Sequence, residues 1–275
     1  MINYTKDSLI GALMDIASSG WHQARRNTRN RRNDGAAGNL LEELLGIEEN
    51  NLPLPNANEW ELKVQRRSTN SLLTLKHLEP SPQTLRFVPN VLLPRYGWRH
   101  QEAGLKYPTT ERSFRQTLSA QEYSGRGFKV EVEAERISLT FSADHVKREH
   151  SDWLEDVRRR AGSLSDLDPR PYWGLADLTA ALSAKLHNTF FVIADNKRVD
   201  GQEFFRFSEV HMLSGFSING YIQLLTQGLA FVDFDARSGH NHGTKFRVRT
   251  ASLPSVYRTN DLVVPHVNVS VDVEG

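Results

Sequence analysis

The segment from Gly38 to Lys63 constrains the fold and chemistry of this 275-residue chain more than any other part of the sequence. It ends in Glu61-Leu62-Lys63, which we expect on a strand. Because strand side chains alternate with a period of two, Glu61 and Lys63 then lie on one face. A carboxylate that can hold a metal ion and an ammonium that can act on the attacking water are thereby brought together. This arrangement suits metal-assisted hydrolysis of a phosphodiester.

A Glu-x-Lys triplet is a weak signal by itself, because solvated strands and helices contain it often. Its surroundings add to it. Residues 38–47 predict a helix that ends in glycine, residues 52–55 form a Pro-rich turn, and the strand then begins at Trp60. Nucleases with this carboxylate–lysine pair usually carry an aspartate several residues earlier as a second metal ligand. Asn56 stands at that place in this chain.

These residues resemble the MvaI/BcnI family of type II restriction endonucleases, whose pattern is roughly G-N-x-L-E-x-L-L-G-I, N-N-L, P-D and G-W-E-L-K. Further stretches, in family order, extend the similarity from Gly38 to Tyr257. They are SLLTLKHLEP at 71–80, YGW at 96–98, YPTTERSFRQTL at 107–118, RGF at 126–128, and VDFDARSG, HNHGTKFRVR and LPSVY between 232 and 257. Two departures stand out: Asn56 replaces the aspartate of the P-D element, and Glu59 replaces the glycine before Trp60.

The resemblance implies an α/β fold with a mixed central sheet flanked by helices, a restriction-endonuclease-like PD-(D/E)xK core, and two lobes around a DNA cleft. It also implies a sequence-specific, Mg²⁺-dependent endonuclease that hydrolyses double-stranded DNA one strand at a time. Family members act as monomers on short, nearly palindromic sites of the C-C-N-G-G type. A cognate DNA methyltransferase of the same restriction-modification system is an implied partner, without direct contact.

The resemblance assigns catalytic roles by position. Asn56 and Glu61 would hold Mg²⁺, helped by the backbone carbonyl of Leu62. Lys63 would orient or deprotonate the water and offset charge in the transition state. Glu42 matches an additional active-site acid, which would orient water or Lys63 or join a second metal site. Because hard cations depend on carboxylate charge, the amide of Asn56 predicts a catalytically impaired chain.

A second candidate constellation lies near the C-terminus: Asp235, Arg237, His240, His242 and Arg247. Arginine pairs bidentately with guanine, aspartate accepts from cytosine N4, and histidine donates or accepts according to its tautomer. A metal site built on His-x-His is an alternative, and an ordinary polar loop is another. The family resemblance favours DNA binding, because these positions match residues implicated in reading G·C pairs.

Two further basic features are weaker candidates. His77 follows the catalytic strand, and the resemblance implies that it faces the DNA opposite the C-terminal histidine pair; a purely structural role is the alternative. Five arginines fall within eight residues, at Arg25, Arg26, Arg29, Arg31 and Arg32. They form either a solvated loop or a set of phosphate contacts.

Composition narrows the class of protein only slightly. Lys and Arg number 34 against 33 Asp and Glu, so DNA binding depends on how the charges are distributed. The absence of cysteine excludes disulfides and thiolate zinc sites. The sequence also has no long apolar run and no secretory segment. Together with the absence of cysteine, this predicts a cytoplasmic protein. The charged stretch Asp144 to Asp168, followed by Pro169-Arg170-Pro171, is the clearest break in composition. We therefore expect a mainly catalytic lobe at 1–150 and a mainly DNA-recognition lobe at 151–275.

Periodicity predicts the remaining elements. The expected helices are 7–18, 40–45, 151–161 and 175–186. The expected strands are 59–64 paired with 71–78, a hairpin over 128–141 that turns near Glu135, and 190–194, 204–213, 229–235 and 245–249.

Two other functions remain open at this point. One is a strand-nicking repair endonuclease resembling MutH, which shares the carboxylate–lysine chemistry; the extensive C-terminal match argues against it. The other is a DNA-binding protein that has lost catalysis through Asn56. Natural loss and deliberate replacement of an aspartate look the same in a single sequence.

Overall fold

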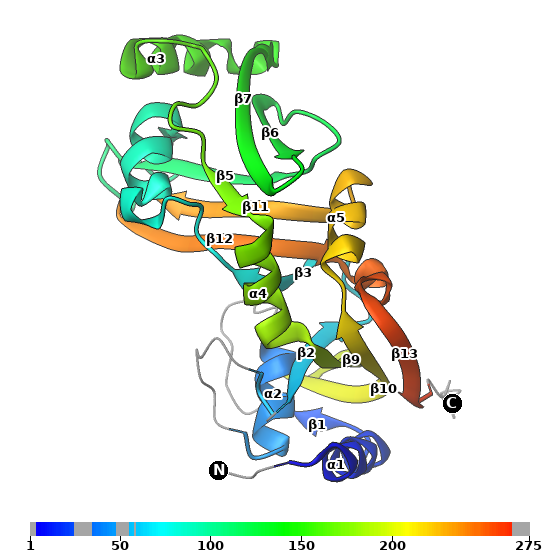
Figure 1. The fold of residues 1–275 in the computed structure, drawn as a ribbon. Coiled ribbons are helices and arrows are strands. Elements are labelled where there is room, and N and C mark those ends of the chain that lie inside the picture. The colour runs from blue at the N-terminus through cyan, green and yellow to red at the C-terminus, as the bar shows by residue number, and fades with distance from the viewer. Residues whose placement is uncertain (1–3, 25–34, 48–54, 58, 266–275) are drawn as a thin grey trace. The chain divides into compact units, whose positions relative to one another are not determined.

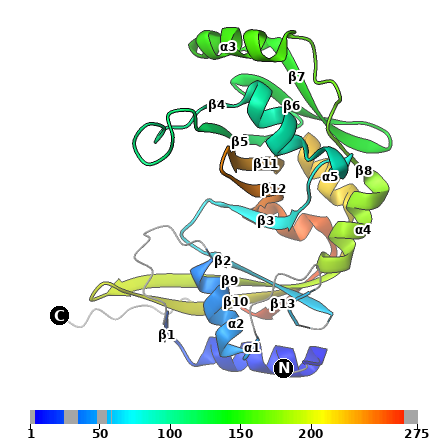
Figure 2. The ribbon, with the colours of Figure 1, turned by 90° about the vertical axis from the view of Figure 1, so that its left-hand side faces the viewer.

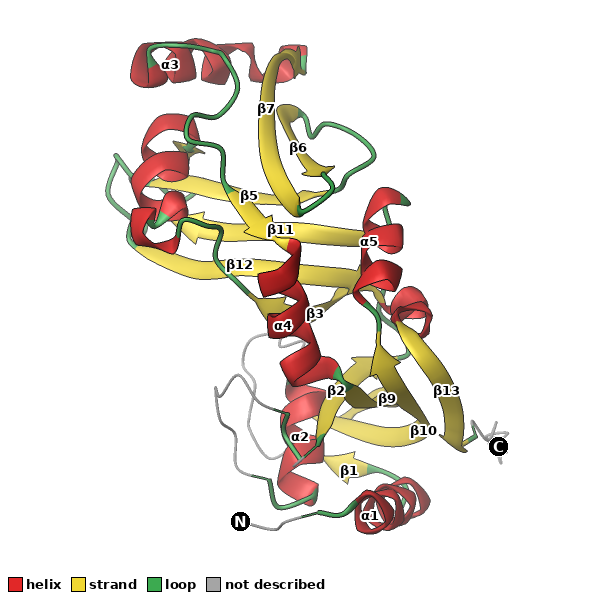
Figure 3. Ribbon diagram, in the orientation of Figure 1, coloured by secondary structure: helices red, strands yellow, loops and turns green. Residues whose placement is uncertain are grey.

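A computed structural model describes residues 4–24, 35–47, 55–57 and 59–265 of the chain. Within them the fold is mixed α/β, with three β-sheets and helices packed against them, so the predicted fold class is confirmed (Figure 1, Figure 3). The chain divides into two compact units. Unit 1 contains Met1–Ser71, Ser183–Ser217 and Leu253–Gly275, and unit 2 contains Leu72–Leu182 and Ile218–Ser252.

Unit 1 is built on a mixed five-stranded sheet. Its strands are β1 (His22–Gln23), β10 (Gln202–Phe216), β9 (Asn188–Val199) and β2 (Trp60–Arg66) in that order, with β13 (Tyr257–Val264) also paired to β10. β2 runs parallel to β9, and the other pairs are antiparallel. The helices α1 (Lys6–Ser18) and α2 (Ala36–Leu44) lie on the same face of this sheet (Figure 2).

The apolar face of this sheet follows from the sequence pattern. Trp60 and Leu62 alternate with polar residues along β2 and join the buried cluster that the helices cover. Leu9 and Leu13, one helical turn apart, are fully buried from α1. A capping box fixes the start of α1, because the Thr5 side chain accepts from the backbone N–H of Ser8. Packing against α2 therefore holds β2 firmly in place.

Unit 2 contains an antiparallel five-stranded sheet. Its order is β3 (Leu72–His77), β12 (His240–Arg249), β11 (Ala230–Arg237), β5 (Arg112–Leu118) and β4 (Trp98–Arg99). Phe114, Phe234 and Phe246 bury their rings on one face. The π-helical segment η2 (Val88–Tyr96) and the helix α5 (Ile218–Thr226) pack against these strands. The apolar face anchors the sheet and leaves the alternate, polar residues on the other face.

A three-stranded sheet completes unit 2. It consists of β6 (Arg126–Val132), β7 (Arg136–Val146) and β8 (Tyr172–Gly174). The predicted hairpin is confirmed, and it turns at residues 133–135. The remaining elements are α3 (Ser151–Ala161), α4 (Leu175–Leu186), and the short helical turns η1 (Gln83–Leu85), η3 (Arg148–His150) and η4 (Thr250–Val256). No helix in the described parts of the chain is long and apolar enough to span a bilayer.

The predicted pairing of strands 59–64 and 71–78 is wrong. β2 pairs with β9, with Trp60 opposite Asn188, whereas β3 pairs with β12, with His77 opposite Lys245. The expectation relied on closeness in sequence, but the chain passes from one unit to the other between these strands, after Ser71. Each strand therefore finds its partner more than a hundred residues away.

The two units interleave along the chain, so no single position separates them. The chain changes unit after Ser71, within α4, directly before α5 and within η4. The assignment of catalysis to 1–150 and recognition to 151–275 stays a prediction about roles.

The β-bulge between β6 and β7 gives a test of backbone strain. Gly127 has a φ of +72°, and a Cβ there would stand 2.3 Å from the carbonyl oxygen of Ser142. Gly162 has nearly the same φ, +73°, but a Cβ would meet nothing within 4 Å. We expect Gly162→Ala to cost about 1–2 kcal/mol of unfolding free energy from its φ alone. Gly127→Ala should cost about 1–3 kcal/mol more, because the clash is added.

Chemical denaturation of the two variants and the unsubstituted chain measures this difference. Equal losses for the two substitutions would show that the close approach at Gly127 is absent in solution.

Candidate functional site

Strand β2 presents Glu61 and Lys63 side by side. Because Trp60 and Leu62 enter the core formed with α1 and α2, the alternate residues lie on the other face of the strand. Glu61 is nevertheless only 1% exposed. Lys63 Nζ donates to Glu61 Oε1 at 2.7 Å. The carboxylate and ammonium of the Glu-x-Lys triplet are therefore in direct contact.

A second lysine also reaches Glu61. Lys185, in the last turn of α4, places its Nζ 3.5 Å from Glu61 Oε1. The other carboxylate oxygen, Oε2, is buried and has no hydrogen-bond partner within the described residues. Two ammonium groups thus share one carboxylate, so this cluster carries a net positive charge. It can attract an anion, and Oε2 remains able to bind a cation or accept a proton.

Asn56 links α2 to β2. Its Nδ2 donates to Glu42 Oε1 at 2.7 Å, and its Oδ1 accepts from the backbone N–H of Leu62 at 3.4 Å. An aspartate at this position could not donate to Glu42, so two carboxylates would face each other. Such a pair requires a cation or a shared proton between them. The amide of Asn56 therefore provides a hydrogen bond to Glu42. An aspartate at this position would instead need a bound cation or proton between the two carboxylates.

The donor atoms at this site fit a metal ion only weakly. The described residues contain no group of three histidine, cysteine, aspartate or glutamate side chains arranged to hold one. The donors that could contribute are Glu61 Oε2, which is buried and unpartnered, and the amide oxygen of Asn56. Hard divalent cations prefer several charged oxygens. Glu61 and Asn56 could therefore hold one metal ion, with Glu61 as its charged ligand.

Tyr257 lies near the same carboxylate. Its hydroxyl and Thr189 Oγ1 are 2.7 Å apart, and both side chains are buried. Burial, with the negative charge of Glu61, raises the pKa of Tyr257 above its ordinary value, although the hydrogen bond with Thr189 opposes this. The phenol stays protonated at neutral pH and can only donate or accept a hydrogen bond.

The recognition candidates lie in unit 2, on the polar face of the sheet. Asp235 and Arg237 alternate along β11 with the buried Phe234 and Ala236. The register places Arg115 of β5 opposite Asp235. The apolar alternation thus fixes which side chains of these strands meet on the polar face.

Asp235 is engaged by two cations. Its Oδ1 accepts from Arg115 Nε at 2.6 Å, and its Oδ2 accepts from Lys245 Nζ at 2.9 Å. Burial acts to raise the pKa of Asp235, but the hydrogen bonds from Lys245 and Arg115 hold it below its ordinary value. Both carboxylate oxygens are in use, so in this arrangement Asp235 orients Arg115 and Lys245.

Arg237 is held by an acid and an aromatic ring. Its Nη1 donates to Glu111 Oε1 at 2.9 Å, and its guanidinium lies 4.4 Å from the centre of the Tyr107 ring. The hydrogen bond from Arg237 lowers the pKa of Glu111 against the effect of burial, and the backbone N–H of Gly239 adds to this. These contacts set the plane of a side chain that was predicted to read guanine.

Arg247 is fixed in a similar way. Its Nη1 donates to Asp233 Oδ2 at 3.1 Å, and its Nη2 donates to the carbonyl of Leu72 at 2.6 Å. The side chain is 23% exposed. Both terminal nitrogens of Arg247 thus bind the protein itself.

The histidine candidates gather at the start of β12. The rings of His240 and His242 meet edge to face, with centres 4.2 Å apart. Burial, aided by nearby cations, lowers the pKa of His242 although Asp235 acts in the opposite direction. A Cβ on Gly243 would lie 3.3 Å from the His77 ring. The structure therefore brings His77, which is far away in sequence, close to the His-x-His-Gly turn.

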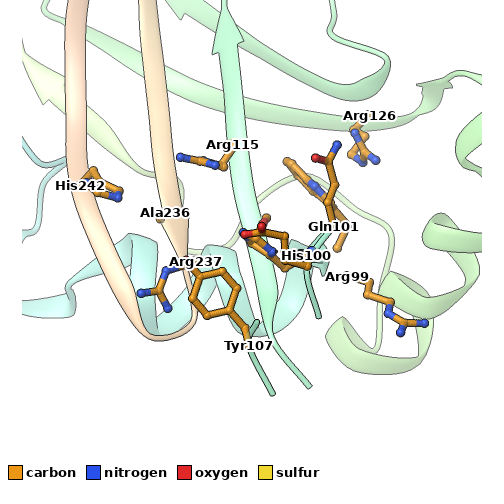
Figure 4. Close-up of a pocket in the computed structure, with 12 residues that line it drawn as sticks. Arg99, His100, Gln101, Tyr107, Arg115, Arg126, Ala236, Arg237 and His242 are labelled. Atoms are coloured by element: carbon orange, nitrogen blue, oxygen red, sulfur yellow. Dashed lines mark hydrogen bonds between the residues drawn. The ribbon is translucent and has the colours of Figure 1, made fainter. Parts of the chain in front are cut away.

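A cavity of about 690 Å³ opens among these side chains of unit 2. Figure 4 shows Arg99, Arg115, Arg126 and Arg237 around it, with Tyr107 beside Arg237. His242 also lines it. Four arginines and one acid, Glu102, line the cavity, so its lining carries an excess of positive charge, which suits an anionic ligand.

The sequence analysis missed several residues of these two sites. Lys185, Glu111 and Arg115 contact Glu61, Arg237 and Asp235, respectively, across more than a hundred residues of chain. Glu111 and Arg115 lie in the block 107–118 that matched the family pattern, but nothing in their local spacing distinguishes them. The arginine cluster over 25–32 lies outside the described residues.

Comparison with known proteins gives one family and one fold. A profile described as the MvaI/BcnI restriction endonuclease family matches residues 10–257. The solved complex of restriction endonuclease MvaI with cognate DNA substrate has a TM-score of 0.73 at 19% identity, covering 95% of this chain and all of that one. MvaI in the absence of DNA gives 0.52 at 17%, covering 96% and 100%. These likenesses show the restriction-endonuclease-like fold. No curated protein matches the sequence significantly.

The Glu111–Arg237 contact predicts a pH dependence of stability. Because the pKa of Glu111 is lower in the folded chain than its ordinary value of 4.5, its ionised form stabilises the fold above that pH. We expect Glu111→Gln to lower the unfolding free energy by about 1–3 kcal/mol at neutral pH. The difference between variant and parent should shrink as the pH falls below 4.5.

Denaturant titrations over this pH range measure the effect. Glu122→Gln, at an exposed position of the same unit, serves as the matched control. A difference that stays constant with pH would contradict the assigned ion pair.

Proposed function

The chain belongs to the MvaI/BcnI restriction endonuclease family, and we propose that within this class of site-specific deoxyribonucleases it is a Mg²⁺-dependent enzyme that cuts duplex DNA one strand at a time. We further propose that it acts as a monomer beside a cognate DNA methyltransferase. Each Glu61–Lys63 pair can serve one strand, so a monomer must rebind in the opposite orientation to cut the second.

The observation that carries this proposal is the charge arrangement at Glu61. The carboxylate is buried, one oxygen meets Lys63 and Lys185, and the other oxygen has no partner within the described residues. A structural ion pair would be expected to use both oxygens, because an unsatisfied buried charge is costly. The free oxygen supports a cation site, and the excess ammonium supports a phosphate site.

Each residue then has a chemical task in the proposed reaction. A bound Mg²⁺ would be held by Glu61, the Leu62 carbonyl and position 56, and would polarise the phosphate and acidify a water. Lys63 orients that water or receives its proton. Lys185 offsets negative charge that develops on the phosphate oxygens. Glu42 acts through position 56 and holds it in line with β2.

Asn56 is proposed to impair this chemistry. The amide donates to Glu42 and leaves Glu61 as the one charged ligand among the candidate donors. Mg²⁺ held by so few carboxylates has low occupancy, and its water is poorly activated. The same observation favours a second function, a DNA-binding protein that cleaves slowly or not at all. The impaired endonuclease and the DNA-binding protein differ only in the rate at which each still cleaves DNA.

The polar face of the unit 2 sheet is proposed to read the DNA sequence. Arg237, with its plane set by Glu111 and Tyr107, is the best placed to pair with guanine. Arg115, held through its Nε by Asp235, lines the same cavity and is a second candidate. His77, His240, His242 and Arg247 would complete the surface. MvaI, which shares the fold, has been solved on its cognate DNA.

The first test restores the charge at position 56. Asn56→Asp should raise the rate of Mg²⁺-dependent plasmid cleavage at least about 100-fold, near 3 kcal/mol of barrier. Nicked circles should accumulate before linear DNA when the enzyme is limiting. Adding Glu61→Gln to this variant should abolish cleavage.

Supercoiled plasmid digested over a range of Mg²⁺ concentrations gives both readouts. If the aspartate variant gains nothing, or if Glu61→Gln leaves cleavage intact, the role of this site is wrong.

Lys185 provides a second test. In the Asn56→Asp background, Lys185→Gln should lower the single-turnover cleavage rate by about 100-fold, since it removes a preorganised positive charge. DNA affinity without metal should change little. Lys6→Gln, at an exposed position of the same unit, is the matched control. A loss confined to affinity would instead assign Lys185 to DNA binding alone.

The third test concerns specificity. Arg237→Ala should weaken binding to the preferred site, found by selection from a randomised duplex library, by about 1–3 kcal/mol. Binding to unrelated duplexes should fall much less. Competition binding without metal measures both, and equal losses on the two kinds of duplex would refute the assignment to guanine.

A further inference from the structure

Arg126 is an unusual member of the cationic cavity in unit 2. It stands at the start of β6, where the register with β7 shifts between Arg126 and Phe128. Gly127, with its φ of +72°, makes this bulge possible. β-Bulges re-aim a side chain relative to its neighbours. Here the re-aimed side chain lines the same cavity as Arg115 and Arg237 (Figure 4).

The guanidinium of Arg126 lies over two indole rings. It lies 4.1 Å from the centre of Trp98 and 5.6 Å from that of Trp153. Its Nε is buried without a hydrogen-bond partner, and no hydrogen bond or ion pair to any described residue reaches the group. Burial lowers the pKa of Arg126, and the electrostatic effect of Glu149 offsets this only in part.

Such a cation contrasts with two other arginines of the cavity, Arg115 and Arg237, while Arg99 donates to the backbone carbonyl of Ala103. Arg115 and Arg237 each bind a carboxylate, Asp235 and Glu111 respectively. Arg126 has aromatic contacts that fix its plane but lacks an acid in hydrogen-bonding contact. A partly desolvated charge without a partner is costly. An anion that enters the cavity would supply the missing partner.

We propose that this cavity is a phosphate subsite, in which the fork of Arg126 binds one backbone phosphate of the DNA beside the surface that includes Arg237. The inference rests on the proposed DNA-binding function. A planar guanidinium held by stacking is suited to a bidentate bond with phosphate oxygens. A stacked nucleobase fits less well, because Arg126 already covers Trp98 and Arg237 already covers Tyr107.

The contact would be independent of sequence, which separates it from base reading. Arg126→Gln should weaken binding to preferred and unrelated duplexes by the same factor. It should also reduce the slope of log affinity against log salt by about 0.9, the effect of one lost phosphate contact. The ratio of variant to parent dissociation constants should therefore fall about threefold between about 50 and 200 mM NaCl.

The experiment measures fluorescence anisotropy of labelled duplexes with the full chain, without divalent metal. Arg159→Gln is the control, because it removes the same charge from an exposed position of the same unit. A scan of duplexes with single neutral methylphosphonate linkages then locates the phosphate. One linkage should weaken binding of the parent chain and leave binding of Arg126→Gln unchanged.

An unchanged salt slope, or a loss seen only on the preferred site, would overturn the proposal while leaving the endonuclease function intact. Failure of the parent chain to bind any duplex would instead refute the proposed function. If Arg126→Gln does not fold, the side-chain ¹⁵Nε resonance of Arg126 in the parent chain, identified by its absence from Arg126→Lys, decides the matter. It should shift on addition of an unrelated duplex, and a resonance that stays in place would overturn the subsite.

Discussion

The contact between one buried carboxylate and two ammonium groups organises unit 1. Glu61 is carried into the interior by β2, since Trp60 and Leu62 on either side belong to the core under α1 and α2. Burying the carboxylate of Glu61 without a partner would cost on the order of several kcal/mol, the penalty for one isolated ion in a protein interior. Lys63 and Lys185 offset that cost from two different elements. The strand, the helix α4 and the parallel partner β9 must all be in place for the cluster to exist.

Ion pairs also fix side chains on the polar face of unit 2, but there acidic residues hold basic ones. There the acids Glu111, Asp233 and Asp235 hold arginines and a lysine in fixed positions. A guanidinium restrained in this way loses less conformational freedom when it binds a ligand. In both described sites, therefore, charged side chains are held in fixed positions by side chains of opposite charge.

Local patterns in the sequence were enough to predict most elements and the motif residues. The alternation around Glu135 predicted the β6–β7 hairpin, and the apolar spacing predicted α1 and α4. The pairing of β2 with β3 was predicted wrongly, because closeness in sequence says nothing about a strand that leaves for another unit after Ser71. Lys185 was missed because its role comes only from the contact with Glu61, which the fold creates. Asn56, by contrast, stood out as a departure from a pattern, although its hydrogen bond to Glu42 needed coordinates.

The interleaving of the two units has a consequence for synthesis of the chain on the ribosome. The polypeptide changes unit at residues 71, 182, 217 and 252. β2 emerges early, but its parallel partner β9 follows more than a hundred residues later, and Tyr257, which bonds Thr189 of β9, comes later still. The Glu61 cluster therefore cannot be complete on a nascent chain that has not yet passed β9. Assembly of this site therefore waits for a segment that is synthesised more than a hundred residues after β2.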